Sequence, residues 1–270
     1  MNEPILSSRR TVLFFLLGVF LAANALLAEL LGVKLFQLEA VFGLPPADFQ
    51  LLGEEHLSFV LSVGVLNWPF VFLATDVLND YFGVRAVRFV TLVTSALIAF
   101  AFLALYAAIA MPPDTGWWLG SSREHGVPDM QAAFTAIFGQ SMNIIVGSLT
   151  AFLVAQLVDA SIFRWWKKRT GERRIWLRAT GSTLVSQLVD SLVVTHVAFW
   201  LLRDWSLPKA TAMALTAYAY KFCMAVLSTP LLYLAHAAIE RWLGEEQAAA
   251  MRAAALLDRQ QQDVQPAPRA

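Results

Sequence analysis

The chain has 270 residues, of which 58% are hydrophobic and 15% charged, and its 20 basic and 20 acidic residues balance to a net charge of zero. This composition is typical of an integral membrane protein, and the balanced charge gives no indication of a nucleic-acid partner. The single cysteine, Cys223, excludes a disulfide framework and a cysteine-based metal site, and no metal or other cofactor is expected.

Six apolar stretches are long enough to cross a bilayer, at about residues 11–33, 57–78, 87–111, 134–163, 179–202 and 211–239. The sequence therefore predicts an all-α polytopic membrane protein with six transmembrane helices. Residues 1–243 are expected to form one transmembrane domain. Residues 244–270 are expected to form a cytoplasmic tail, which could begin as a helix extending the last span and which ends in disorder.

The distribution of basic residues predicts the orientation. One set of loops holds Arg9, Arg10, Arg85, Arg88, the seven basic residues of segment 164–178, Arg241 and the arginines of the tail. The opposite loops hold only Lys34, Arg123, Arg203 and Lys209. Because basic loops remain on the cytoplasmic side, both termini and the basic segment are expected in the cytoplasm.

The tetrapeptide Gln-Leu-Val-Asp occurs twice within apolar stretches, at residues 156–159 and 187–190. Each copy places a glutamine and an aspartate three residues apart, hence on one helix face. Gln156 and Gln187 are expected at similar depth in consecutive antiparallel spans. They form either an amide pair between helices or part of a binding site.

Ionisable residues within a span are costly, so they usually pair with one another or mark a functional site. Asp190 and Lys221 each follow the start of their span by roughly 11 residues, about 16 Å of helix, and could therefore meet near the midplane. A structural salt bridge and a substrate role both stay open for this pair. His196 and His236 are interpreted as packing residues.

Four further polar residues lie near the cytoplasmic ends of predicted spans: Asp76, Asn79, Asp80 and Asp159. The helix dipole disfavours an anion at a C-terminal end. Arg85, Arg88 or Arg164 are near enough in sequence to neutralise Asp76 and Asp159. For Asp159, such an interfacial ion pair remains an alternative to ligand binding.

The segment Asn67-Trp68-Pro69-Phe70 is expected to kink the second span, because a proline inside a helix removes one backbone hydrogen bond. Trp68 and Phe70 could provide a stacking surface beside it. Rings, amides and carboxylates together suit a planar polar heterocycle better than an inorganic ion. The predicted binding residues are Asn67, Trp68, Phe70, Asp76, Asn79, Asp80, Gln156, Asp159, Gln187, Asp190 and Lys221.

Several of these residues lie in segments that resemble a known family: 74–85 (Ala-Thr-Asp-Val-Leu-Asn-Asp-Tyr-Phe-Gly-Val-Arg), 151–159, 176–183, 220–222 and 229–230. In these segments the chain resembles the queuosine precursor transporters of the vitamin uptake transporter family, also called the YhhQ family. Asp80 stands where the family usually has a glutamate. The resemblance implies a fold similar to the binding subunits of energy-coupling-factor transporters. It also implies a multi-pass protein of the inner membrane that imports 7-cyano-7-deazaguanine or 7-aminomethyl-7-deazaguanine for queuosine synthesis.

The leading hypothesis is therefore a facilitated or ion-coupled importer whose partners are a small planar heterocycle and membrane lipid. An alternative is a vitamin-type binding subunit that depends on a separate ATPase module, since the chain has no Walker A sequence. An intramembrane enzyme is disfavoured because Gly-x-Ser-x-Gly and His-Glu-x-x-His are absent. A structural scaffold ranks last, and homo-oligomerisation stays open.

Overall fold

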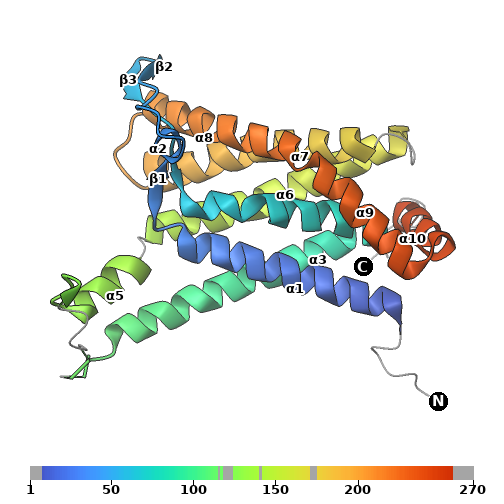
Figure 1. The fold of residues 1–270 in the computed structure, drawn as a ribbon, viewed down its shortest axis with the longest axis horizontal. Coiled ribbons are helices and arrows are strands. Elements are labelled where there is room, and N and C mark those ends of the chain that lie inside the picture. Colours follow the sequence, from blue (N-terminus) through green and yellow to red (C-terminus); the bar gives the residue numbers. More distant parts are fainter. Residues whose placement is uncertain (1–7, 115, 118–123, 140–141, 171–174, 258–270) are drawn as a thin grey trace, which may run out of the picture.

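Long apolar helices make up most of the chain in a computed structural model that describes residues 8–114, 116–117, 124–139, 142–170 and 175–257 (Figure 1). The helices are α1 (Arg9–Leu31), α2 (Leu38–Val41), α3 (Trp68–Ala110), α5 (Met130–Phe138), α6 (Met142–Thr170), α7 (Ile175–Thr195), α8 (Leu207–Leu227), α9 (Thr229–Leu243) and α10 (Glu245–Leu257). A short 3-10 turn, Val63–Leu66, precedes α3, and a π-helical stretch, His196–Leu201, continues α7.

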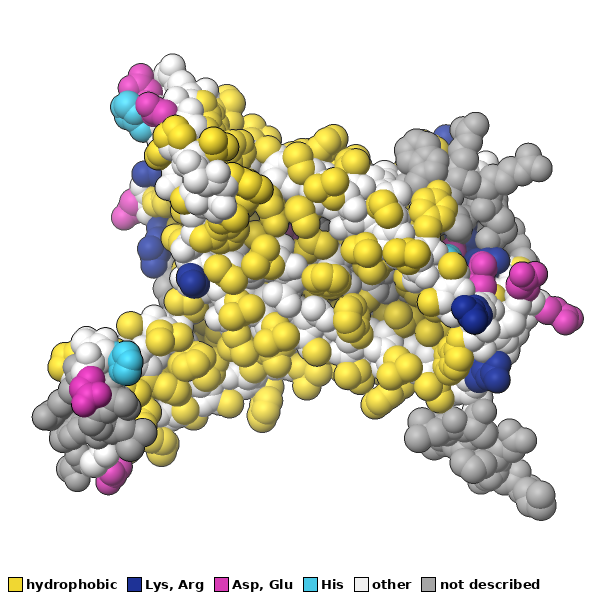
Figure 2. Space-filling view, viewed as in Figure 1, with side chains coloured by type: hydrophobic (Ala, Val, Ile, Leu, Met, Phe, Trp, Pro, Cys, Tyr) yellow, Lys and Arg dark blue, Asp and Glu magenta, His cyan; other side chains and the backbone are white. Residues whose placement is uncertain are grey.

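Five helical stretches within the described residues are long and apolar enough to cross a membrane: Arg9–Leu31, Trp68–Ala110, Met130–Thr170, Ala179–Leu201 and Leu207–Leu227. Large apolar side chains cover their outer faces, and Phe100 is 69% exposed. Figure 2 shows these side chains as a yellow belt between two ends where charged side chains gather. Such a surface suits lipid and would be costly in water. The predicted all-α polytopic membrane class is confirmed.

The second and third predicted spans belong to one 43-residue helix, α3, which reverses direction at Gly83. Gly83 has φ 79° and ψ 175°, a backbone conformation that residues with a Cβ rarely adopt. The first arm of α3 runs beside α6, and the second arm turns back toward α5 (Figure 1). Six passes, with each arm of α3 crossing once, remain a prediction.

The predicted start of the second span at residue 57 is wrong, because this part of the chain forms strands. β1 (Leu35–Gln37) pairs antiparallel with β4 (Val60–Ser62), and β2 (Phe49–Leu51) pairs antiparallel with β3 (Glu54–Leu57). These two ribbons lie at the end of the bundle opposite α10 (Figure 1).

A buried carboxylate, Glu39, holds the loop between these strands in place. Its Oε1 accepts backbone hydrogen bonds from Phe59 at 2.9 Å and Ala47 at 3.1 Å. The Phe59 bond is the main reason that the pKa of Glu39 lies below its ordinary value, since donors to a carboxylate favour its ionised form. The loop is therefore ordered by a side chain that satisfies backbone amides.

The predicted kink at Pro69 is also wrong. Pro69 lies in the first turn of α3, where its missing N–H would have had no intrahelical partner. The actual break comes later in the chain, in the last predicted span, where α8 ends at Leu227 and α9 begins at Thr229 with Pro230 in its first turn.

The sequence suggested that the tail could extend the last span as a helix. In the structure the tail does not continue α9. Gly244, with φ 92°, ends α9, and α10 turns back to pack against α3 (Figure 1). The predicted disorder at the end of the tail falls on residues 258–270, which lie outside the described residues. Arg9 at the start of α1 donates to the carbonyl oxygen of Trp242 at 2.6 Å, so α1 begins at the end of the bundle where α9 finishes.

Two apolar clusters support the bundle. One joins α1, both arms of α3 and α6 through residues such as Leu21, Leu78 and Phe152. The other lies at the α10 end and joins α3, α6, α9 and α10; it includes Tyr81 and Phe163. Both clusters include residues of α3 and so fix its position in the bundle. The first arm of α3 forms one wall of the pocket described below.

Candidate functional site

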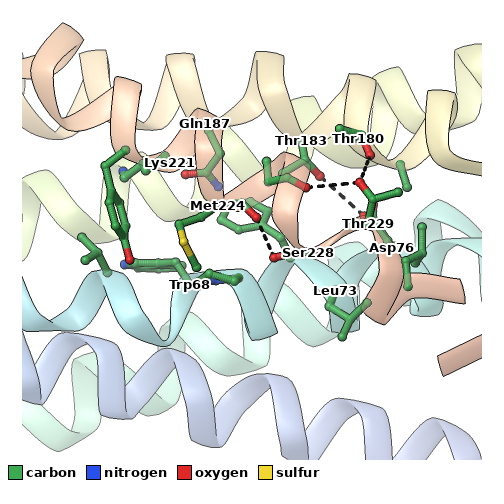
Figure 3. Close-up of a pocket in the computed structure, with 17 residues that line it drawn as sticks. Trp68, Leu73, Asp76, Thr180, Thr183, Gln187, Lys221, Met224, Ser228 and Thr229 are labelled. Atoms are coloured by element: carbon green, nitrogen blue, oxygen red, sulfur yellow. Dashed lines mark hydrogen bonds between the residues drawn. The ribbon is translucent and has the colours of Figure 1, made fainter. Parts of the chain in front are cut away.

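A pocket lies between the first arm of α3, α7, α8 and α9 (Figure 3). The space between its lining residues is about 510 Å³ when the open solvent at its mouth is included. Its polar lining consists of Asp76, Thr180, Thr183, Gln187, Tyr220, Lys221, Ser228 and Thr229, and its apolar lining includes Trp68, Phe72, Leu73 and Met224.

Gln187 is the most informative side chain of the pocket. It is 3% exposed, and neither its Oε1 nor its Nε2 has a hydrogen-bond partner among the described residues. A buried polar atom without a partner costs about 1 to 3 kcal/mol. Such a group at a pocket wall is expected to bind a ligand that supplies the missing donor and acceptor.

Carboxylate and hydroxyl groups form the other end of the pocket. Asp76 is 5% exposed, and the Thr183 hydroxyl donates to its Oδ2 at 3.5 Å, a long hydrogen bond. The hydroxyls of Thr180 and Thr229 lie 2.9 Å apart and connect α7 to α9. Figure 3 shows Asp76 near this hydroxyl pair and Gln187 near Lys221, so the two polar groups lie toward opposite ends of the pocket.

Asp190 and Lys221 form the ion pair that their predicted depth suggested. The ammonium group of Lys221, on α8, donates to Asp190 Oδ2 on α7. Their side chains are 9% and 11% exposed. Lys221 lines the pocket, but its charge is balanced by Asp190, so this wall presents a neutral pair to a ligand.

The two predicted aromatic residues have different surroundings. Trp68 lines the pocket and packs on Phe72 and Phe152, with ring centroids 6.0 and 5.7 Å away. Phe70 is 42% exposed, lies beside Phe20 and does not contribute to the pocket. Two positions along a helix turn a side chain through about 200°, so both rings cannot face the same pocket.

Asn67 also lies outside the pocket lining. It ends the 3-10 turn before α3, and its side-chain amide donates to Asn24 Oδ1 on α1 at 3.3 Å. It therefore connects α1 to the start of α3.

Of the two alternatives for Gln156 and Gln187, the amide pair is not found among the described residues. Gln156 is fully buried against α3, where its Oε1 accepts a hydrogen bond from Thr75 at 3.0 Å, and its Nε2 has no partner in the described part of the chain. It does not line the pocket. The two glutamines face different neighbours because the relative rotation of α6 and α7 is set by packing, which sequence depth does not determine.

Asp159 likewise has an internal partner. It is fully buried, and its Oδ1 accepts a hydrogen bond from Ser186 of α7 at 3.0 Å. Ser186 is thus its partner, where an interfacial ion pair was the alternative. Asp159 therefore joins α6 to α7 through a hydroxyl group.

Asn79 and Asp80 lie away from the pocket. The Asn79 amide donates to the carbonyl oxygen of Ala160 at 3.1 Å. Asp80 is fully buried; its Oδ1 lies 2.6 Å from Lys167 Nζ, and its Oδ2 lies 3.0 Å from His236 Nε2. The sequence had placed Lys167 in a cytoplasmic segment and interpreted His236 as a packing residue, so this cluster was missed.

The sequence also missed the hydroxyl lining of the pocket. Thr180, Thr183, Tyr220 and Thr229 line it together with Asp76. All four lie in segments 176–183, 220–222 and 229–230, which carry the family resemblance. That resemblance was the available signal, since a hydroxyl in a helix usually bonds its own backbone and gives no sign of a site.

A family model described as "Putative vitamin uptake transporter" matches residues 62–235, a range that contains every residue of the pocket lining. The chain belongs to the vitamin uptake transporter family. The match ends within α9, so α10 lies beyond it.

Named relatives agree with membership of the vitamin uptake transporter family. A protein of Bacillus subtilis (strain 168) named "Probable queuosine precursor transporter" is 29% identical over 183 residues, which are 67% of this chain and 74% of that protein. A protein of Escherichia coli (strain K12) named "Queuosine precursor transporter" is 26% identical over 175 residues, 63% of this chain and 70% of the relative. No solved structure shows a significant match to this chain.

Proposed function

We propose that this protein is a transporter, not an enzyme, and that it imports a queuosine precursor across the cytoplasmic membrane. The proposed substrates are 7-cyano-7-deazaguanine and 7-aminomethyl-7-deazaguanine. Two relatives named as queuosine precursor transporters support the class of substrate. The pocket between α3, α7, α8 and α9 supports a binding site within the apolar belt, because buried polar groups and a ring line it together.

The single observation that carries the proposal is the buried amide of Gln187, whose donor and acceptor both lack partners among the described residues. The lactam edge of a deazaguanine has a ring N–H donor beside a carbonyl acceptor. A carboxamide is complementary to that edge, because its oxygen accepts while its NH₂ group donates. Gln187 is therefore proposed to hold the lactam edge.

Two further groups of the pocket fit the remaining features of the ring. Asp76 can accept hydrogen bonds from the exocyclic amine, since a carboxylate offers only acceptors. The indole of Trp68 can stack on the flat face of the heterocycle, an interaction worth about 1 to 3 kcal/mol per base. Lys221, neutralised by Asp190, is proposed to border the ligand and keep α7 and α8 in place.

The proposed orientation places the α10 end of the bundle in the cytoplasm. Basic residues gather there, including Arg85 and Arg88 after the Gly83 turn and Lys167, Lys168 and Arg169 in the last turn of α6. The positive-inside rule assigns such an end to the cytoplasm. The proposed mechanism is alternating access without nucleotide hydrolysis by this chain, in which the pocket opens first to one side and then to the other.

Uptake of labelled 7-cyano-7-deazaguanine tests this proposal. Cells unable to synthesise the compound should accumulate label only when they express the chain, and unlabelled deazaguanine should compete whereas adenine and biotin should not. Proteoliposomes containing the purified chain alone should equilibrate the label without ATP. Absence of uptake by cells in which the chain is correctly inserted would refute the proposed substrate assignment. Uptake by cells but not by proteoliposomes would indicate a separate ATPase module.

A further inference from the structure

A cluster of buried charges lies between the pocket and the α10 end of the bundle, and the proposed binding site does not use it. Asp80 of α3 is fully buried and contacts Lys167 Nζ of α6 at 2.6 Å and His236 Nε2 of α9 at 3.0 Å. Lys167 is 3% exposed and His236 is 4% exposed. Three helices are therefore joined by one carboxylate.

The helical register places this cluster next to the pocket. Asp76 lines the pocket on α3 and precedes Asp80 by four residues, and Leu232 lines it on α9 and precedes His236 by four residues. Residues four apart lie one above the other on the same helix face. The cluster therefore lies one helical turn beyond the pocket on two of its walls.

Helix α10 covers the cluster from the far side. Lys167 Nζ donates to the backbone oxygen of Asp80 at 2.8 Å and to that of Arg252, on α10, at 3.4 Å. The Arg252 guanidinium in turn donates to Glu240 of α9 and, at 3.4 Å, to the Tyr81 hydroxyl of α3.

Apolar packing strengthens this contact. Ala248 and Met251 of α10 are buried in the cluster that includes Tyr81 and Leu232. At the reversal of α3, a Cβ added to Gly83 would lie 3.1 Å from the backbone oxygen of Ala255, so α10 lies directly against this turn. The helix is thus bound both to the turn of α3 and to the charged cluster.

We infer that Asp80, Lys167 and His236 form the inner gate of the pocket and that α10 is the clasp that keeps the gate closed. This inference goes beyond the proposed function and rests only on the pocket being part of the transport path. A ligand leaving toward the α10 end must pass where α3, α6 and α9 are joined. Separating a buried ion pair is costly unless water or another partner replaces each contact, so the closed arrangement is stable until α10 loosens. Lys167 contacts both the carboxylate and the backbone oxygen of Asp80, and it also contacts the backbone oxygen of Arg252 on α10. Closure therefore depends most on Lys167.

Cysteine labelling of the full chain tests the gate. Cys223, the single cysteine, is exposed and is replaced by Ser, and Thr229→Cys then places a thiol at the pocket wall. A membrane-impermeant maleimide is applied from the α10 side in oriented vesicles, and the rate is normalised to labelling after unfolding. The test variants in this background are Lys167→Met and Arg252→Gln. The matched control is Lys168→Met, which removes the same charge from the exposed neighbouring side chain.

The parent and Lys168→Met should label slowly from the α10 side. Lys167→Met should label about tenfold faster, since a minor open state of a few per cent would become the major one. Arg252→Gln should show a smaller increase, because it loosens only the clasp. Should Lys167→Met fail to fold, Arg252→Gln decides the question alone.

Two outcomes would overturn the inference: fast labelling of the parent from the α10 side, or test variants that fold and label no faster than Lys168→Met. Labelling requires no substrate. A failed gate is therefore distinguishable from a failed substrate assignment, which the uptake experiment tests separately.

Discussion

The tetrapeptide Gln-Leu-Val-Asp occurs at residues 156–159 of α6 and 187–190 of α7, and the two copies have different surroundings. In α6, Gln156 accepts a hydrogen bond from Thr75 and Asp159 accepts one from Ser186. In α7, Gln187 lies at the pocket wall without a hydrogen-bond partner within the described residues, and Asp190 pairs with Lys221. The first copy joins helices to one another, whereas the second faces the pocket.

This difference shows that identical residues acquire their roles from the helices packed against them. α6 lies against α3 and α7, so its polar groups meet threonine and serine hydroxyls. α7 borders α8 and the pocket, so its amide meets open space and its carboxylate meets a lysine. Equivalent substitutions in the two copies should therefore have different effects on stability and transport.

The largest contrast is expected between the two aspartates. Asp190→Asn leaves the Lys221 ammonium buried without its carboxylate, and removing one partner of a buried ion pair typically lowers the free energy of unfolding by about 3 to 5 kcal/mol. Asp159→Asn keeps an oxygen that can accept from Ser186, so its cost should stay below about 1 kcal/mol. Unfolding of both variants in the same detergent measures the difference.

The double variant Asp190→Asn with Lys221→Met provides the control for this pair. It should recover much of the lost stability, because no buried charge then remains without a partner. If transport also recovers, the pair acts only in packing. Equal destabilisation by Asp190→Asn and Asp159→Asn would contradict the proposed contrast between the copies.

The next effect concerns Trp68, the indole ring that lines the pocket together with Gln187. Trp68→Leu should raise the KM for deazaguanine uptake about tenfold or more, because base stacking on an aromatic side chain contributes about 1 to 3 kcal/mol. Phe70→Leu is the matched control; this side chain faces away from the pocket, so KM should not change. A larger effect of Phe70→Leu would show that the ligand binds elsewhere.

The smallest expected effect belongs to the first glutamine. Gln156→Leu removes the acceptor for Thr75, and a lost intramolecular hydrogen bond contributes about 1 kcal/mol. The Thr75 hydroxyl keeps its bond to the Val71 carbonyl oxygen, which limits the loss. Thermal unfolding should show a small decrease in Tm while the KM for uptake is unchanged. An altered KM with normal stability would assign Gln156 to the site.

Composition and span length predicted much of the fold, because a bilayer imposes a minimum length of apolar helix. The same rule could not locate Gly83, where one helix reverses, nor the strands at residues 35–62, since short ribbons leave little hydrophobic pattern. Pro69 was misplaced because proline is suited both to a kink and to the first helical turn. Sequence alone does not tell whether a proline lies at a kink or in the first turn of a helix.

The candidate site was predicted in part. Depth along the helix brought Asp190 and Lys221 together correctly. Depth gives no rotation, however, so Gln156 and Phe70 were assigned to a site that they do not face. Lys167 was counted as a surface charge because the predicted span ended at residue 163. In the structure α6 continues to Thr170, and Lys167 is buried within it.

The central claim is that the Gln-Leu-Val-Asp copy at residues 187–190, and not the copy at 156–159, contacts the substrate. Binding of 7-cyano-7-deazaguanine to the purified full chain in nanodiscs tests this claim most directly. Isothermal titration should show that Gln187→Leu raises Kd about tenfold to a hundredfold, as loss of buried hydrogen bonds to a ligand predicts. Gln156→Leu should leave Kd unchanged. Equal Kd values for Gln187→Leu and the parent chain, with both proteins folded, would contradict the account.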